Sequence, residues 1–143
     1  MAKNTGKEFE NLTHEVFAAL SATRSDVKVE RNVFLPSQLT GDPRQIDVLL
    51  RSEVACLSML TIIECRDYKK KLNVTYVDGL HSKLLEVAAH KAVFVTRRGF
   101  TKGAMRKAER LKITLCTPHQ SSEDFAKRAG SGNLDSVISG ISA

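Results

Sequence analysis

The sequence has no tryptophan, only three prolines and only three cysteines, and aromatic residues make up 6% of it. The cysteines are widely spaced and odd in number, which excludes a CxxC zinc motif and a paired disulfide framework. Cys65 and Cys116 lie inside apolar runs and are predicted to be reduced thiols of the core. No apolar run approaches the roughly 18 to 20 residues that cross a bilayer, and Met1 to Lys7 lacks the apolar segment of a secretory signal. We therefore expect a cytoplasmic protein without a membrane segment.

Acidic residues are outnumbered in this chain. It contains 16 Asp and Glu against 22 Lys and Arg, a formal net charge of +6. With 42% hydrophobic and 27% charged residues, its 143 residues have the balance of one folded domain. The positive excess fits a polyanionic partner, although it does not identify one.

Hydrophobic periodicity predicts an alternation of helices and strands. The predicted helices cover residues 6–22, 74–88 (capped by Asn73) and 101–110. The predicted strands cover residues 27–35, 44–51, 57–65, 91–96 and 112–117, with a short hairpin connection at 52–56. The apolar run over 91–96 is of the kind that is buried on both faces of a sheet.

The resulting order, α-β-β-β-α-β-α-β, belongs to the α/β class. It predicts a mixed central sheet flanked by helices, with right-handed crossovers in the C-terminal half. We expect residues 1–118 to form this domain. Beyond them the periodicity weakens, so residues 119–143 are interpreted as a tail, either disordered or folded into a short docking helix.

Two acidic residues stand in apolar strands. Asp47 lies inside the strand over 44–51, and Glu64 lies near the end of the stronger apolar run over 57–65. Strand residues two apart share a face, so Glu64 and Arg66 should point one way and Ile63 and Cys65 the other. If the two strands pair as a hairpin, Asp47 and Glu64 converge. Two close carboxylates repel each other unless a cation joins them, and Mg²⁺ prefers such oxygen ligands.

Simpler explanations stay open for each acid. A single carboxylate at a strand end is more commonly a solvated terminus. Glu64 and Arg66 also suit a plain salt bridge on one face of the strand.

Four segments resemble the Mrr-like restriction endonucleases of the PD-(D/E)XK superfamily. They are Gly6–Glu10 (GKEFE), Arg44–Val48 (RQIDV), Ile63–Lys69 (IECRDYK) and Lys91–Thr96 (KAVFVT), the last followed by Gly99-Phe100-Thr101. The resemblance covers roughly residues 6–117. It implies a restriction-endonuclease-like αβββαβ core and a Mg²⁺-dependent endodeoxyribonuclease that hydrolyses DNA phosphodiester bonds, with Mn²⁺ as a substitute ion.

The resemblance also implies roles for individual residues. Asp47 and Glu64 would hold the metal together with the carbonyl oxygen of Cys65. Glu10 matches an acid that some relatives turn toward the metal, although a first-turn acid also suits the helix dipole. Gln45 matches a glutamine of some relatives, where a polar side chain orients water.

Arg66 departs from the superfamily pattern, which has lysine two residues after the second acid. A guanidinium does not give up its proton, so Arg66 is excluded as a general base. It still binds a phosphate oxygen and stabilises charge in the transition state. Because of this departure, a second hypothesis stays open, in which the protein is a catalytically inactive DNA-binding module of the same fold. A Holliday-junction-resolvase-like nuclease is a third.

The basic residues expected to contact DNA follow the acidic pair or cluster around the later helix. They are Lys69, Lys70, Lys71, Arg97, Arg98 and Lys102. A basic rim around an acidic centre fits phosphate binding, although a solvated helix face explains the later cluster equally well. One catalytic centre per domain predicts a homodimer, or two binding events, for cleavage of both strands.

Overall fold

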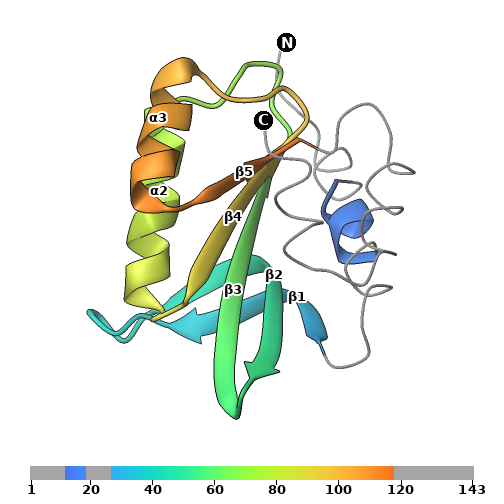
Figure 1. The fold of residues 1–143 in the computed structure, drawn as a ribbon, viewed down its shortest axis with the longest axis vertical. Coiled ribbons are helices and arrows are strands. Elements are labelled where there is room, and N and C mark those ends of the chain that lie inside the picture. Colours follow the sequence, from blue (N-terminus) through green and yellow to red (C-terminus); the bar gives the residue numbers. More distant parts are fainter. Residues whose placement is uncertain (1–11, 19–26, 118–143) are drawn as a thin grey trace.

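The computed structural model describes residues 12–18 and 27–117 of the chain (Figure 1). Residues 12–18 are helical, within the predicted first helix, and Glu10 and the tail over 119–143 lie outside the described residues. The further elements are β1 (Lys28–Pro36), β2 (Pro43–Val54), β3 (Leu57–Arg66), α2 (Val74–Glu86), β4 (Lys91–Thr96), α3 (Lys102–Leu111) and β5 (Thr114–Cys116). The predicted order of elements is confirmed. None of the described helices is long and apolar enough to span a membrane.

The five strands form one mixed sheet in the order β1-β2-β3-β4-β5. β1, β2 and β3 are antiparallel neighbours, whereas β4 is parallel to β3 and β5 is parallel to β4. Antiparallel strands can be joined by short turns, but parallel neighbours need a crossover. Helices α2 and α3 provide these two crossovers, so the predicted mixed sheet flanked by helices is confirmed.

Helices cover both faces of the sheet (Figure 1). The helix over 12–18 packs Leu12 and Val16 into a cluster with side chains of β2, β3, β4 and β5. On the opposite face, α2 and α3 contribute Val77, Leu80 and Ala104 to a second cluster. β4 lies between the two layers, and its residues from Ala92 to Thr96 are buried, as its apolar run predicts.

Two boundaries differ from the prediction because residues other than glycine adopt left-handed backbone conformations. Ala55 and Cys56 have φ of 52° and 70° and close the β2–β3 hairpin in two residues. Two consecutive left-handed residues are the geometry that suits a two-residue hairpin. The expected connection over 52–56 was therefore too long. Similarly, Lys112 (φ 60°) ends α3, and β5 begins at Thr114 rather than at residue 112.

β1 changes the face that its side chains present to the core. Val29 packs against the cluster under the helix of residues 12–18, whereas Val33 packs against the α2–α3 cluster. Residues four apart on a regular strand share a face, so the strand turns over between these two valines. Asn32, which lies between them, has a left-handed φ of 54°. The uniform alternation predicted over 27–35 was wrong in this respect.

β2 turns over at the position that faces this point of β1. Ile46 belongs to the α2–α3 cluster and Val48 to the opposite cluster, with Asp47 between them. The antiparallel ladder between β2 and β3 runs from the hairpin as far as the pair Val48↔Ile63. Asp47 is thus the first residue of β2 beyond the ladder, at the point where the two strands separate.

Candidate active site

The carboxylate of Asp47 is buried and held through both oxygens. The residue is 4% exposed. Oδ2 accepts a hydrogen bond from the Cys65 backbone N–H (2.9 Å), and Oδ1 accepts one from Nε2 of Gln45 (3.1 Å). The same Gln45 nitrogen donates to Oδ1 of Asn32 (3.0 Å). Cys65 of β3 and Gln45 of β2 therefore hold the Asp47 carboxylate in place before any ligand arrives, and Asn32 of β1 in turn holds Gln45.

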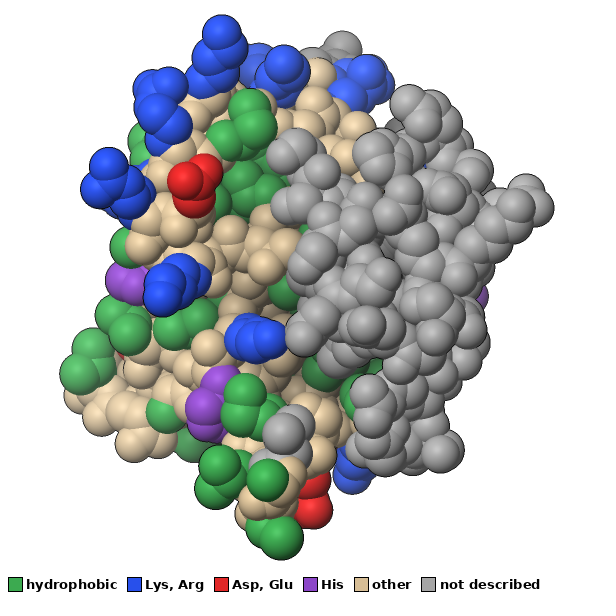
Figure 2. All heavy atoms as spheres, viewed as in Figure 1, with side chains coloured by type: hydrophobic (Ala, Val, Ile, Leu, Met, Phe, Trp, Pro, Cys, Tyr) green, Lys and Arg blue, Asp and Glu red, His purple; other side chains and the backbone are tan. Residues whose placement is uncertain are grey.

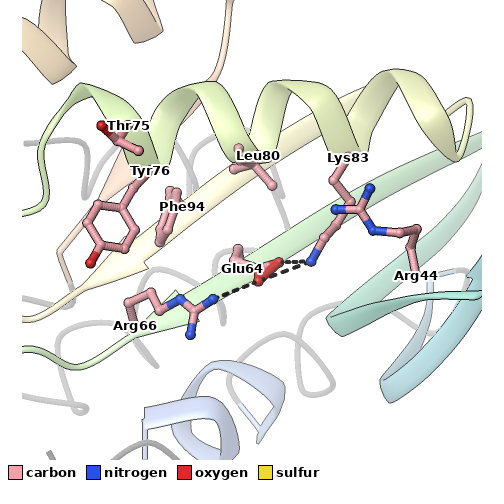
Figure 3. Close-up of a pocket in the computed structure, with 9 residues that line it drawn as sticks. Arg44, Glu64, Arg66, Thr75, Tyr76, Leu80, Lys83 and Phe94 are labelled. Atoms are coloured by element: carbon pink, nitrogen blue, oxygen red, sulfur yellow. Dashed lines mark hydrogen bonds and ion pairs between the residues drawn. The ribbon is translucent and has the colours of Figure 1, made fainter.

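Glu64 occupies the position on β3 that the register would pair with Asp47. It is 6% exposed and accepts two hydrogen bonds from Nζ of Lys83, at 2.9 Å to Oε1 and 3.2 Å to Oε2. Nη2 of Arg66 lies 3.9 Å from Oε2. Figure 3 shows the carboxylate between these two cations, beneath α2. The salt bridge anticipated with Arg66 is present at its outer limit, and Lys83 is the closer partner.

Burial shapes the electrostatics of both carboxylates. Desolvation raises the pKa of Asp47 above its ordinary value. The hydrogen bond from the Cys65 N–H and the positive charges of Lys83 and Arg66 lower this pKa, but by less than desolvation raises it. Desolvation also raises the pKa of Glu64, and the negative charge of Asp47 raises it further. The two acids therefore lie close enough to repel each other in a site that disfavours their charged forms. A divalent cation between them would relieve both costs.

A cavity of about 190 Å³ opens beside Glu64. Arg44, Arg66 and Lys83 line it together with residues of the first half of α2. Arg44 is already paired with Glu86, on the last turn of α2. Nε of Arg66 is buried and makes no hydrogen bond within the described part of the chain. The cavity therefore presents positive charge next to the acidic pair.

Lys83 is the residue of this site that sequence reasoning missed. It lies on α2, and its side chain is only 12% exposed. The signal for it was present, because Lys83 follows Leu80 by three residues and Tyr76 by seven, at one edge of the apolar stripe of the helix. A lysine on the buried face of an amphipathic helix is expected to pair with an acidic residue, because charged side chains are rarely buried without a partner.

The structure brings most of the predicted site residues together. Glu64 and Arg66 share the α2 face of β3, while Ile63 and Cys65 face the other layer, as predicted. Gln45 contacts Asp47 directly.

The expected DNA contacts are mostly exposed. Lys69, Lys70, Lys71, Arg98 and Lys102 are exposed. Arg97 makes ion pairs with Glu15 (3.1 Å) and Asp67 (3.3 Å), so it ties the helix over 12–18 to the end of β3. Figure 2 shows Lys and Arg side chains gathered over α3 and the adjoining edge of the molecule.

The donor set of the site suits a hard cation that keeps part of its water. Among the described residues, no group of three or more His, Cys, Asp and Glu side chains could enclose a metal ion. Asp47 and Glu64 offer two buried carboxylates, and the peptide of Cys65 lies against Asp47. Mg²⁺ is usually held by one or two carboxylates, with water and phosphate oxygens completing its shell. The residues present therefore fit such an ion.

Comparisons with solved structures place the chain in a known fold. It is similar to AF1548, a protein of unknown function, with a TM-score of 0.62 and 18% identity over 75% of this chain and 56% of that one. Protein VC1899 from Vibrio cholerae gives 0.54 and 23% identity over 90% and 35% of the two chains. The MspJI restriction endonuclease in complex with a 27-mer oligonucleotide gives 0.52 and 15% identity over 95% and 32%.

These identities, all below a quarter, establish the fold alone. The chain spans between 32% and 56% of the length of these three proteins. No curated protein matches the chain. A family model described as a restriction endonuclease, of the Mrr catalytic type, matches residues 1–120 of the 143. This chain therefore belongs to the Mrr-type restriction endonuclease family.

Proposed function

We propose that this chain is a Mg²⁺-dependent endonuclease that hydrolyses DNA phosphodiester bonds. The observation that carries the proposal is the buried pair Asp47 and Glu64, adjacent at the end of the β2–β3 ladder with both pKa values raised. Membership of a restriction endonuclease family supports the reaction type. The oligonucleotide complex of MspJI, which shares the fold, supports DNA as the substrate.

Asp47, Glu64 and the carbonyl oxygen of Cys65 would hold the Mg²⁺ ion. When bound, the ion supplies an acidified water and neutralises charge on phosphate. The Cys65 N–H and Gln45 keep the Asp47 carboxylate in place, so little reorganisation is needed when DNA arrives.

Arg66 is assigned the role of phosphate clamp. Its side chain is 42% exposed and lines the cavity beside Glu64. A guanidinium so placed donates to non-bridging phosphate oxygens and stabilises the negative charge that builds on them during hydrolysis. Lys69, Lys70 and Lys71 follow it on an exposed loop and are assigned to the DNA backbone. Cleavage of both strands would use a homodimer.

One observation favours a second candidate function. Arg66 stands where the superfamily has lysine, so the alternative is a catalytically inactive module that binds DNA through the same surface. A junction-resolving nuclease differs from the first proposal only in the shape of the DNA it takes.

The test is a supercoiled-plasmid assay with the purified chain in Mg²⁺, in Mn²⁺ and in EDTA. We expect nicked and then linear plasmid with either ion and no product in EDTA. DNA binding without cleavage in both ions would support the inactive module. Preferential cleavage of a four-way junction over matched linear duplex would identify the resolving activity.

A further inference from the structure

Lys83 connects two strands across the gap that opens where their ladder ends. Its ammonium donates to the Gln45 carbonyl oxygen on β2 (2.8 Å) and to both carboxylate oxygens of Glu64 on β3. An ammonium has three protons, and these three contacts account for all of them. Lys83 therefore holds Glu64 in its present orientation from α2, the helix that packs on the face of β3 that carries Glu64.

This contact differs from an ordinary surface salt bridge in its burial and in its partner. The Lys83 side chain is 12% exposed, so solvent screens the interaction weakly. Arg44, another cation of the same cavity, has its own partner in Glu86, whereas the principal partner of Lys83 is the acid assigned to the metal. Both oxygens of that acid are already accepting hydrogen bonds from the ammonium.

A divalent ion at Glu64 would compete with this ammonium. The competition is electrostatic, because the ion would add two positive charges beside the existing charge of Lys83 in a buried site. Because Glu64 carries a single negative charge, we expect the divalent ion to displace the Lys83 ammonium from the carboxylate. The contact of Lys83 with the Gln45 carbonyl does not involve Glu64 and can persist.

We propose that Lys83 is the resident counter-cation of this site, which keeps Glu64 paired between β2 and β3 and releases it when a divalent ion binds. The inference rests on the proposed function in one respect, the assignment of Glu64 as a metal ligand. Lys83 is a positioning residue in this scheme, since it acts through Glu64. It weakens metal binding to the free protein while keeping the acid in place.

The experiment measures Mn²⁺ affinity by electron paramagnetic resonance for the wild type, Lys83→Met, Lys83→Arg and a control, Lys28→Met. Lys28 is an exposed lysine of β1, so the control removes the same charge elsewhere. We expect Lys83→Met to bind Mn²⁺ on the order of tenfold more tightly, since a buried like charge has been removed. Lys83→Arg and Lys28→Met should stay close to the wild type. A purely structural role predicts the opposite sign, because loss of the contact would loosen Glu64 and weaken binding.

A second measurement uses the wild type alone and decides the matter if Lys83→Met does not fold. Acetylation of lysines, read by mass spectrometry, should label Lys83 several-fold faster with Mn²⁺ than without it, while labelling of Lys28 stays unchanged. Equal or weaker Mn²⁺ binding by folded Lys83→Met overturns the proposal, as does unchanged protection of Lys83 in the loaded wild type. Absence of Mn²⁺ binding in both proteins overturns it too. Cleavage enters neither readout, so an inactive wild type that passes both tests would contradict the proposed function alone.

Discussion

At the scale of single residues, the burial of the Asp47 carboxyl has a cost that depends on pH. It is buried in an apolar strand, and its pKa is raised despite hydrogen bonds to both oxygens. The folded protein therefore holds the proton of this carboxyl more tightly than the unfolded chain does. The stabilisation due to this group is full below its unfolded pKa, near 3.8, and is lost as pH rises through the higher folded value.

Asp47→Asn should therefore abolish metal binding and cleavage while raising the stability of the metal-free protein. In EDTA at about pH 7 we expect the variant to melt at a higher temperature than the wild type. The difference should shrink as pH falls through the raised folded pKa and should vanish below about 3.8, where the wild-type carboxyl is neutral in both states. Differential scanning calorimetry across this range, with calorimetric Mg²⁺ titration, checks both parts. Nicking at the wild-type rate would remove Asp47 from the mechanism.

Arg66 gives a prediction about charge without proton transfer. Arg66→Lys should keep measurable activity, since lysine also binds phosphate as a point charge. Arg66→Ala should lose about a hundredfold or more in rate, as removal of one such electrostatic donor usually does. Single-turnover nicking rates measure both variants, and Mn²⁺ affinity in Arg66→Lys should stay unchanged. An inert wild type beside an active Arg66→Lys variant would instead favour the inactive module.

At the scale of elements, the site depends on a paired irregularity in β1 and β2. Both strands change the face they present to the core at Asn32 and Asp47, which face each other across the hairpin. β2 leaves the ladder with β3 at the same point, so the Cys65 N–H bonds the Asp47 side chain. The change of face at Asp47 therefore both positions this acid and coincides with the end of the β2–β3 ladder.

At position 32, substitution by glycine should change the stability of the protein little, whereas substitution by a β-branched residue should lower it. Its φ of 54° costs glycine nothing, but costs most other residues about 1–2 kcal/mol. We expect Asn32→Val to lower the free energy of unfolding by about that amount and Asn32→Gly to change it far less. Urea denaturation of the two variants makes the comparison. Equal losses would show that the hydrogen bond that Asn32 Oδ1 accepts from Gln45, rather than the backbone conformation, stabilises this part of β1.

At the scale of the whole molecule, the distribution of charge matters more than its total. The net charge of +6 includes lysines and arginines that are already engaged. Arg97 pairs with Glu15 and Asp67, and Lys107 pairs with Asp78. The exposed loop that follows β3 carries three consecutive lysines beside the cavity residue Arg66.

Replacing Lys69, Lys70 and Lys71 together by alanine should weaken DNA binding and flatten its dependence on salt. Each lost phosphate contact reduces the slope of log K against log salt concentration by about 0.9 for duplex DNA. Fluorescence anisotropy at several salt concentrations measures the slope. Because the three lysines are exposed, the thermal stability of the variant serves as the folding control and should match the wild type. An unchanged slope would identify the run as a solvated loop that DNA does not contact.

Most of the fold and the acidic pair followed from local sequence. Periodicity predicted the order of elements, because alternation and helical spacing are properties of neighbouring residues. The same alternation placed Glu64 and Arg66 on one face and Ile63 and Cys65 on the other, and the hairpin register then set Glu64 opposite Asp47. Boundaries that depended on left-handed alanine, cysteine or lysine were wrong, since these residue types carry no turn signal.

What only the tertiary structure decided are contacts between residues far apart in the chain. Lys83 reaches Gln45 and Glu64 because α2 packs over the separating strands, and no local pattern specifies which acid a buried lysine meets. Arg97 was expected to contact DNA on sequence grounds, but its position beside Glu15 and Asp67 depends on how the helix over 12–18 covers the sheet. Local sequence determines which groups are available for chemistry. Packing decides their charge partners, and where the groups are buried, as for Lys83 and Glu64, an unpaired charge would be costly.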